Sequence, residues 1–321
     1  MSLVNMKNNK KSKCDVSIII EANNQQDYLV DLNQELHDIF QTSNFKYEII
    51  YVDDGSNDAT WKEMLKIAAE FVNAKLVKLR TSFGESAALD AGMKVATGEK
   101  IIYFTCRVKI NPQNLIRFVD KIDEGYDIVM GKRSPRRDSK LNQFVSKLFN
   151  TFTNRMTKLK LHDINSGVLA TRKSVLEHVP FYGALNAFIP VLAHRQGYKI
   201  SEETVEQLPG HFAQSLYPKN YIKRLLDFIS VIFISKYSKK PLHFLGFLGV
   251  IFSLVGSIIT IYLFIYRILG IGGIAGRPML LLGTMLVIIG IQLISIGLLG
   301  EMIIYTHANE IEDYNIEEII E

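Results

Sequence analysis

The stretch YEIIYVDDGSNDATWKEMLKIAAEFV, residues 47–72, predicts a strand, a tight turn and a helix in direct succession. Its first half is rich in β-branched and aromatic residues, which is typical of a buried strand. The strand ends in Asp53 and Asp54, Gly55 permits the turn, and Asp58 is a suitable N-cap for the helix that follows. By itself, this succession is compatible with a ligand-binding turn or with a simple capped turn.

The same alternation continues on both sides of this stretch. Strands are predicted at 16–20, 47–54, 74–80, 100–104 and 126–131, and helices at 27–40, 58–72, 84–98 and 112–122. Alternation of this kind predicts an α/β domain with a mostly parallel sheet and helices on both faces. Ligands of such sheets bind beyond the carboxyl ends of the strands. The expected site therefore draws on residues 21–24, 53–56, 80–84, 105–109 and 131–137.

Composition excludes some classes of protein. The formal net charge of +4 over 321 residues is small and gives no indication of nucleic-acid binding. Cys14 and Cys106 are isolated thiols, which suits a reducing compartment and provides no disulfide framework.

Two uncharged runs, 242–266 and 278–300, predict a pair of transmembrane helices. At about 1.5 Å per residue, each is longer than the ~30 Å hydrocarbon core of a bilayer. The linker 267–277 is short and rich in glycine, so the two helices form a hairpin. Basic residues are denser before the first span than in the linker, which predicts a cytoplasmic location for the large N-terminal domain.

The remaining segments complete the predicted organisation. The α/β domain is assigned to 14–218, after a disordered basic arm at 1–13, and an acidic cytoplasmic tail is assigned to 301–321. In the segment 219–241, apolar residues dominate and the charges cluster at the ends, which favours an amphipathic helix in the membrane interface. An ordinary packed helix is the alternative.

A set of motifs in one order gives the sequence a family resemblance. After VDDGSNDAT (52–60) come LRTSFGESAALDAGMKVATGEKIIYF, GYDIVMGKR, DINSGVLATRKSVL, KKPLHFLGFLG and GIQLISIGLLGE. Over nearly its whole length the chain resembles family-2 glycosyltransferases with a GT-A fold. More narrowly, it is similar to the membrane-bound polyprenyl-phosphate sugar transferases, relatives of dolichol-phosphate mannose synthase. The resemblance implies hexosyl transfer from a nucleotide diphosphate sugar to undecaprenyl or dolichyl phosphate on the cytoplasmic face.

The resemblance also implies roles for individual residues. The family's nucleotide-binding positions are matched by Asp53, Asp54, Gly55, Ser56, Arg80 and Gly84. Positions near the acceptor phosphate are matched by Arg133, Ser166 and Gly167. Asp163 matches an acidic residue just before the Ser–Gly element, and it is expected to be catalytic.

The chain departs from the family where a metal would bind. The family's fourth strand ends in Asp-x-Asp, whose carboxylates hold Mg²⁺ or Mn²⁺ against the donor diphosphate. Thr105 and Arg107 occupy those two positions here; the first is a weak ligand and the second cannot be one. No cofactor is therefore assigned, although the family implies one of these cations. Three other elements also differ. EANNQ replaces Pro-x-Tyr-Asn-Glu, Val168 and Leu169 stand where an arginine often follows the Ser–Gly element, and GHFAQS (210–215) replaces Arg-x-x-Gly-x-Ser.

Two hypotheses about this loop stay open. In the first, Arg107 and Lys109 replace the metal, because a guanidinium binds phosphate oxygens bidentately and stabilises a leaving diphosphate. Arg107 is then a second catalytic residue. In the second, the chain is an inactive glycosyltransferase-like membrane protein that scaffolds or regulates an active paralogue. The expected partners are a nucleotide-sugar, a polyprenyl phosphate, the membrane, and a second copy or the paralogue. The expected location is an inner membrane of bacterial type.

Overall fold

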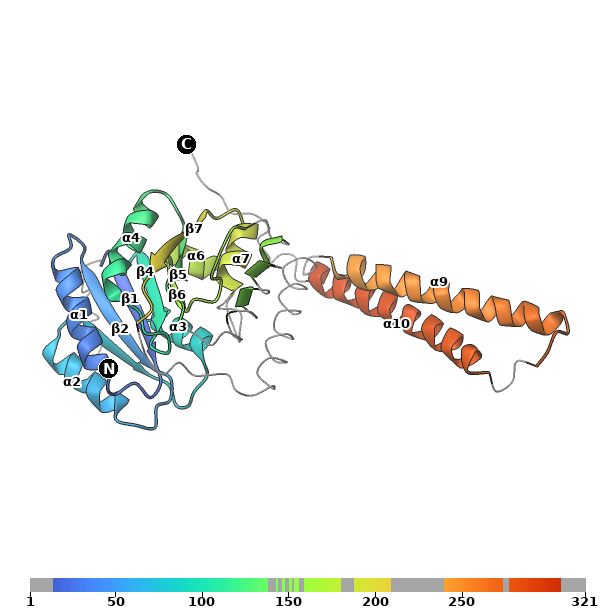
Figure 1. The fold of residues 1–321 in the computed structure, drawn as a ribbon, viewed down its shortest axis with the longest axis horizontal. Coiled ribbons are helices and arrows are strands. Elements are labelled where there is room, and N and C mark those ends of the chain that lie inside the picture. The colour runs from blue at the N-terminus through green and yellow to red at the C-terminus, as the bar shows by residue number, and fades with distance from the viewer. Residues whose placement is uncertain are drawn as a thin grey trace, which may run out of the picture. The chain divides into compact units, whose positions relative to one another are not determined.

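The computed structural model describes residues 14–137, 143, 146–147, 150–151, 153–155, 159–179, 188–208, 240–273 and 277–306. Contacts divide the chain into two compact units, Met1–Asp227 and Phe228–Glu321. The first holds the α/β domain and the second holds two long helices (Figure 1). The predicted arm, nearly all of the predicted interfacial helix, the GHFAQS element and most of the predicted tail lie outside the described residues.

Within the described residues, seven strands form one sheet in the order β3-β2-β1-β4-β6-β5-β7. They are β1 (Val16–Ala22), β2 (Tyr47–Asp53), β3 (Ala74–Lys78), β4 (Lys100–Thr105), β5 (Ile128–Arg133), β6 (Val168–Arg172) and β7 (Ile200–Val205). Neighbouring strands are parallel except that β6 runs antiparallel to both β4 and β5. The prediction of a mostly parallel α/β sheet is confirmed, whereas β6 and β7 were not predicted.

Helices cover both faces of the sheet (Figure 1). They are α1 (Leu29–Gln41), α2 (Thr60–Glu70), α3 (Glu85–Met93), the short 3₁₀ helix η1 (Pro112–Asn114), α4 (Leu115–Asp123), α6 (Lys173–His178) and α7 (Ile189–Arg195). Val16, Ile18 and Ile20 of β1 share one buried cluster with apolar residues of α1, α2 and α4. Ile19 points to the other face, where its side chain contacts Gly92 of α3. Because strand side chains alternate between faces, β1 is buried on both sides.

The strand register brings the predicted ligand-binding ends together. Ala22 lies opposite Asp53 on β2, and Glu21 lies opposite Thr105 on β4. Because β6 is antiparallel, its first residue, Val168, lies opposite Phe104 near the end of β4. The loop that precedes β6 therefore reaches the same edge of the sheet as the carboxyl ends of β1, β2 and β4.

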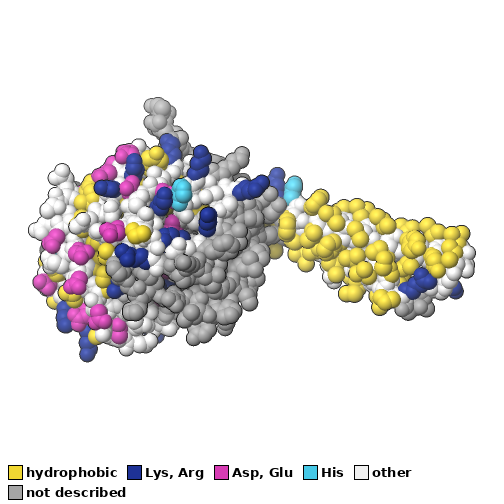
Figure 2. Space-filling model, viewed as in Figure 1, with side chains coloured by type: hydrophobic (Ala, Val, Ile, Leu, Met, Phe, Trp, Pro, Cys, Tyr) yellow, Lys and Arg dark blue, Asp and Glu magenta, His cyan; other side chains and the backbone are white. Residues whose placement is uncertain are grey.

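The second unit contains α9 (Pro241–Ile268) and α10 (Pro278–Thr306), where the sequence predicts spans at 242–266 and 278–300. Each helix contains an 18-residue stretch with a mean hydropathy of 2.4. Only 17% of that stretch in α9 and 11% of that in α10 is buried within the chain. A core helix of a soluble domain would be mostly covered. Figure 2 shows hydrophobic side chains over the visible face of this hairpin. Both helices are long and apolar enough to cross a membrane.

Glycines hold α9 and α10 in close contact. A Cβ added at Gly249 would lie 2.6 Å from the carbonyl oxygen of Gly290, and one added at Gly256 would lie 2.6 Å from that of Gly283. On each helix the two glycines are seven residues apart, so they lie on one side of it. The first of the two α9 glycines meets the second of the α10 glycines, and the second meets the first, which shows an antiparallel hairpin, as predicted.

Candidate functional site

The turn between β2 and α2 is shaped around Asp53. This side chain is fully buried; its Oδ1 accepts a hydrogen bond from the Ser56 backbone N–H at 2.9 Å. Its Oδ2 has no hydrogen-bond partner among the described residues. Gly55 has a φ of +68°, and an added Cβ would lie 2.5 Å from the carbonyl carbon of Thr81. Only glycine fits this turn. The turn keeps Asp53 buried with one carboxylate oxygen that no described residue satisfies, which marks it as a candidate ligand contact.

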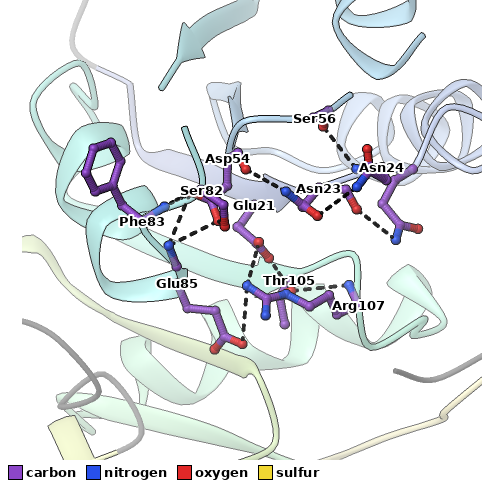
Figure 3. Close-up of polar contacts among 12 residues, drawn as sticks. Glu21, Asn23, Asn24, Asp54, Ser56, Ser82, Phe83, Glu85, Thr105 and Arg107 are labelled. Carbon is purple, nitrogen blue, oxygen red and sulfur yellow. Dashed lines mark hydrogen bonds and ion pairs between the residues drawn. The ribbon is translucent and has the colours of Figure 1, made fainter. Parts of the chain in front are cut away.

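Asp54 has a different role, because both its carboxylate oxygens are used within the chain (Figure 3). It accepts hydrogen bonds from the Ser82 hydroxyl at 2.7 Å and from the backbone N–H groups of Phe83 at 2.7 Å and Gly84 at 3.1 Å. It therefore fixes the loop that leads into α3. Arg80, at the start of that loop, is exposed.

Two asparagines tie the β1–α1 loop to the β2–α2 turn (Figure 3). The Asn23 side-chain amide donates to the Asp54 carbonyl at 2.5 Å. The Asn24 backbone N–H donates to the Ser56 hydroxyl at 3.0 Å, and its side-chain oxygen accepts from the Asn57 N–H at 2.8 Å. Asn24 has a φ of +54°, a conformation that asparagine tolerates better than most residues.

At the ends of β1 and β4, three residues form a polar cluster (Figure 3). The Thr105 hydroxyl donates a short hydrogen bond to Glu21 Oε2, and Arg107 Nη2 donates to Glu21 Oε1 at 2.9 Å. The Arg107 backbone N–H also donates to the Thr105 hydroxyl oxygen at 3.2 Å. The Glu21 side chain is 0% exposed, whereas that of Arg107 is 39% exposed. A second carboxylate, Glu85 at the start of α3, lies 4.0 Å from Arg107 Nη2.

The charges of this cluster favour an ionised arginine. Burial by itself would lower the pKa of the Arg107 guanidinium, but the charge of the adjacent Glu21 carboxylate and its hydrogen bond act in the opposite direction. With the further attraction of Glu85, the pKa of Arg107 is raised above its ordinary value. A permanent cation therefore stands at this end of β4, neutralising a carboxylate that is fully buried.

The predicted Ser–Gly element lies against this cluster. The Thr105 backbone N–H donates to the Gly167 carbonyl at 3.1 Å. Gly167 has a φ of +75°, and an added Cβ would lie 2.8 Å from Thr105 Cγ2. The buried Ser166 hydroxyl donates to the Val168 carbonyl at 3.0 Å. These bonds fix the loop before β6 beside the end of β4.

A second charged group contains the predicted acceptor-side residues. Arg133, at the end of β5, donates from Nε to Asp163 Oδ2 at 2.6 Å and from Nη2 to Asp163 Oδ1 at 3.0 Å. Arg136 Nη1 lies 3.6 Å from the same carboxylate. Glu202 of β7 accepts the Asp163 backbone N–H at 3.1 Å. The Asp163 carboxylate thus binds Arg133 at two points and lies beside Arg136.

The structure therefore joins some predicted residues and separates others. Arg107 lies with Thr105 and Gly167, and Arg133 lies with Asp163, whereas Lys109 places its Nζ 4.8 Å from the centre of the Tyr28 ring. The sequence interpretation treated Glu21 only as part of an altered motif and missed its role. The available signal was a carboxylate that ends an otherwise apolar, β-branched strand at the ligand-binding edge.

The order of the strands, the DDGS turn and the loop before β6 define a GT-A glycosyltransferase fold. Residues 17–179, just over half of the chain, match the family described as glycosyl transferase family 2. The chain belongs to this family of sugar-transferring enzymes. It is also 28% identical over 308 residues to a dodecaprenyl-phosphate galacturonate synthase of Rhizobium johnstonii, covering 94% of this chain and 90% of that protein.

Solved structures support the same fold. Glucosyl-3-phosphoglycerate synthase of Mycobacterium tuberculosis in complex with UDP matches with a TM-score of 0.54 and 16% identity, covering 69% of this chain and 80% of that one. The same enzyme with Mn²⁺, UDP and glucosyl-3-phosphoglycerate matches with a TM-score of 0.51 and 15% identity over the same shares. At this level of identity the likeness concerns the fold alone.

A divalent cation does not fit the end of β4 in this chain. The two positions that would supply carboxylates carry a hydroxyl and a guanidinium, and Arg107 would repel a second cation. The carboxylate closest to them, Glu21, already uses both oxygens on Thr105 and Arg107. Among the described residues no group of three or more His, Cys, Asp or Glu side chains gathers as a metal site.

Proposed function

We propose that this chain transfers a sugar from a nucleoside diphosphate sugar to a polyprenyl phosphate at a membrane. The observation that carries the proposal is its similarity to the dodecaprenyl-phosphate galacturonate synthase over 94% of its length. The uncovered 6%, about 19 of 321 residues, is shorter than either apolar helix of 28 or 29 residues. The similarity therefore extends into the α/β domain and into both helices.

The chemistry of such a transfer is a substitution at the sugar's C1. A phosphate oxygen of the lipid forms a bond to C1, the bond from C1 to the diphosphate oxygen breaks, and the nucleoside diphosphate leaves with the electron pair. A phosphate monoester has a second pKa of about 6, so it is largely ionised at neutral pH and needs no strong general base. Positioning of the two substrates and stabilisation of the leaving group then account for catalysis.

The site residues divide between the two substrates. We assign the nucleotide to the edge formed by Asp53, Ser56 and Arg80, since Asp53 offers a buried oxygen with no partner and Arg80 is exposed there. Asp54 supports this edge indirectly by fixing the loop 82–84.

We assign the acceptor phosphate to the side of Arg133, Ser166 and Gly167. Asp163 orients Arg133 in this scheme and takes no proton, because both its oxygens contact the guanidinium. The dense basic residues before α9 support a cytoplasmic location of this site.

A second function is favoured by one observation. The replacement of both metal-binding carboxylates by Thr105 and Arg107 is also expected in a chain that has lost catalysis and serves as a partner of an active paralogue or of a second copy. Retained nucleotide binding does not separate the two functions, but turnover does.

The test is a transfer assay on the detergent-solubilised full chain. UDP- and GDP-sugars are paired with undecaprenyl, dodecaprenyl and dolichyl phosphate, and glycosyl lipid phosphate is measured by mass spectrometry together with nucleoside diphosphate release. Product from at least one pair, lost in Asp53→Asn, supports the proposal. Absence of product from every pair, in protein that still binds nucleotide, supports the partner function instead.

A further inference from the structure

Two departures from the family pattern meet in space. Glu21 stands at the end of β1, where the family usually has proline, and Thr105 with Arg107 stands at the end of β4, where the family has its two aspartates. In the structure, both oxygens of Glu21 are bonded to these two side chains (Figure 3). Changes more than 80 positions apart in the sequence thus form one connected group.

The group preserves the local balance of charge. Two aspartates and a divalent cation sum to zero, and so do Glu21 and Arg107. Glu21 is 0% exposed, so its carboxylate is costly to bury unless a cation accompanies it. Thr105 fixes the second oxygen of Glu21, which leaves the carboxylate a single orientation toward the guanidinium.

Arg107 keeps capacity for a ligand. Only its Nη2 donates to a side chain of the described residues, and 39% of its side chain is exposed. A guanidinium has five N–H donors in a rigid plane, and its remaining edges match two phosphate oxygens. Glu85 at 4.0 Å limits its movement on the side of α3.

We propose that Arg107, held in place by Glu21 and Thr105, is a fixed cation that binds the donor's diphosphate in place of a metal. This inference rests on the proposed function, and it adds how the leaving diphosphate is stabilised during the sugar transfer. Arg107 would be a catalytic residue, because it touches the leaving diphosphate. Glu21 would be a positioning residue that acts through Arg107.

Calorimetric titration of the full chain in detergent tests the proposal. UDP and GDP are compared with uridine and guanosine, which lack the diphosphate, each in EDTA and again in Mn²⁺. We expect the binding nucleotide to have the same affinity within about twofold in both conditions. We expect Arg107→Met to weaken nucleoside diphosphate binding by about 10- to 100-fold, the size of a bidentate charged contact, with nucleoside binding unchanged.

Arg107→Met also leaves Glu21 buried without a cation, so loss of folding must be separated from loss of binding. The double variant Glu21→Gln with Arg107→Met removes both charges; we expect it to recover the unfolding temperature but not the diphosphate affinity. Arg117→Met, which removes an exposed arginine paired only loosely with Glu203 at 3.8 Å, is the matched control and should bind normally.

The outcomes separate this inference from the proposed function. Nucleotide binding that requires Mn²⁺, or that survives Arg107→Met, overturns the metal replacement and leaves the transferase proposal standing. Binding of neither nucleotide in either condition excludes UDP- and GDP-sugars as donors and counts against both proposals. Recovery of diphosphate affinity in the double variant shows that Arg107 acts only by neutralising Glu21, and it also overturns the inference.

Discussion

Arg133 and Asp163 form a buried two-point ion pair, with Nε 2.6 Å from Oδ2 and Nη2 3.0 Å from Oδ1. The pair joins the end of β5 to the loop before β6, and the side chains are 7% and 2% exposed. Such a pair is costly to break from one side, because the remaining charge stays buried. It fixes the backbone on which the predicted acceptor site is built.

We predict that Arg133→Met destabilises the protein by ~3–5 kcal/mol, because among the described residues it leaves the buried Asp163 with Arg136 alone, at 3.6 Å, to compensate its charge. Chemical denaturation followed by far-UV circular dichroism measures the change. Arg117→Met is the control and should stay within ~0.5 kcal/mol of the wild type, since surface pairs contribute little. Equal changes in the free energy of unfolding for both variants would show that the Arg133–Asp163 pair contributes no more to stability than a surface ion pair.

Gly167→Ala should destabilise the loop before β6 by ~1–3 kcal/mol. The added methyl group would meet Thr105 Cγ2 at 2.8 Å, and the φ of +75° disfavours any side chain. Thr105→Ala removes the colliding group, so the double variant should lose less than the sum of the single changes. Strict additivity, measured in a double-mutant cycle by thermal unfolding, would contradict contact between the two positions.

Asp53 and Asp54 should respond differently to the same substitution. Asp54→Asn weakens the bonds to Ser82, Phe83 and Gly84 and should lower stability by ~1–3 kcal/mol, because charge-assisted bonds are lost. Asp53→Asn should reduce nucleotide affinity about tenfold or more with a smaller change in stability, since its Oδ2 bonds to no described residue. Thermal unfolding measures the change in stability, and calorimetric titration measures the change in nucleotide affinity. If Asp54→Asn lowered affinity and Asp53→Asn lowered stability, the two roles would have to be reversed.

Glu48 should contribute to stability that is lost in acid. Burial alone would raise the pKa of this carboxyl, but Lys75, Ser17 and the Thr97 backbone N–H together outweigh it, so the pKa in the folded protein lies below its ordinary value. A lowered folded pKa means that the contribution is present above the unfolded pKa and is lost as pH falls through the folded one. Glu48→Gln should therefore flatten the decline of the unfolding temperature below pH ~4.5. If the unfolding temperature of the variant declined in acid as it does in the wild type, Glu48 would be excluded as the cause of that decline.

The hairpin offers a prediction with an internal control. Gly249→Ala places a methyl group 2.6 Å from the carbonyl oxygen of Gly290, so it should force the helices apart and lower the unfolding temperature in detergent. Gly246→Ala meets only a side chain of its own helix, Leu242, at 3.0 Å. It should be neutral or stabilising, because alanine favours helix over glycine. Equal effects at both positions would contradict close packing at Gly249.

The sequence predicts best where one local signal is sufficient. The runs VSIII and KIIYF are apolar and β-branched or aromatic, and both form central strands at nearly the predicted bounds. β6 and β7 lack such a signal, because VLATR is short and ISEETV carries two glutamates and a serine. Their place in the sheet depends on pairing with distant strands, which no local pattern records.

The site shows the same contrast. The DDGS turn is recognisable because its residues are contiguous, and Arg107 draws attention because a guanidinium cannot ligate a metal. Glu21 gains its meaning only from its register opposite Thr105 on the neighbouring strand. Likewise, Arg133 and Asp163 are thirty positions apart in the sequence. Each residue could be singled out by its motif, but their contact becomes apparent only in the folded chain.

The contact of α9 with α10 has a consequence for any lipid substrate. At the levels of Gly249 and Gly256 the two backbones touch, so no passage runs between the helices there. A long isoprenoid tail that meets this hairpin must lie along its outer, apolar sides among the acyl chains. A substitution on those outer sides would change the surface that faces the acyl chains, whereas only a substitution at the glycine contacts could separate the two backbones.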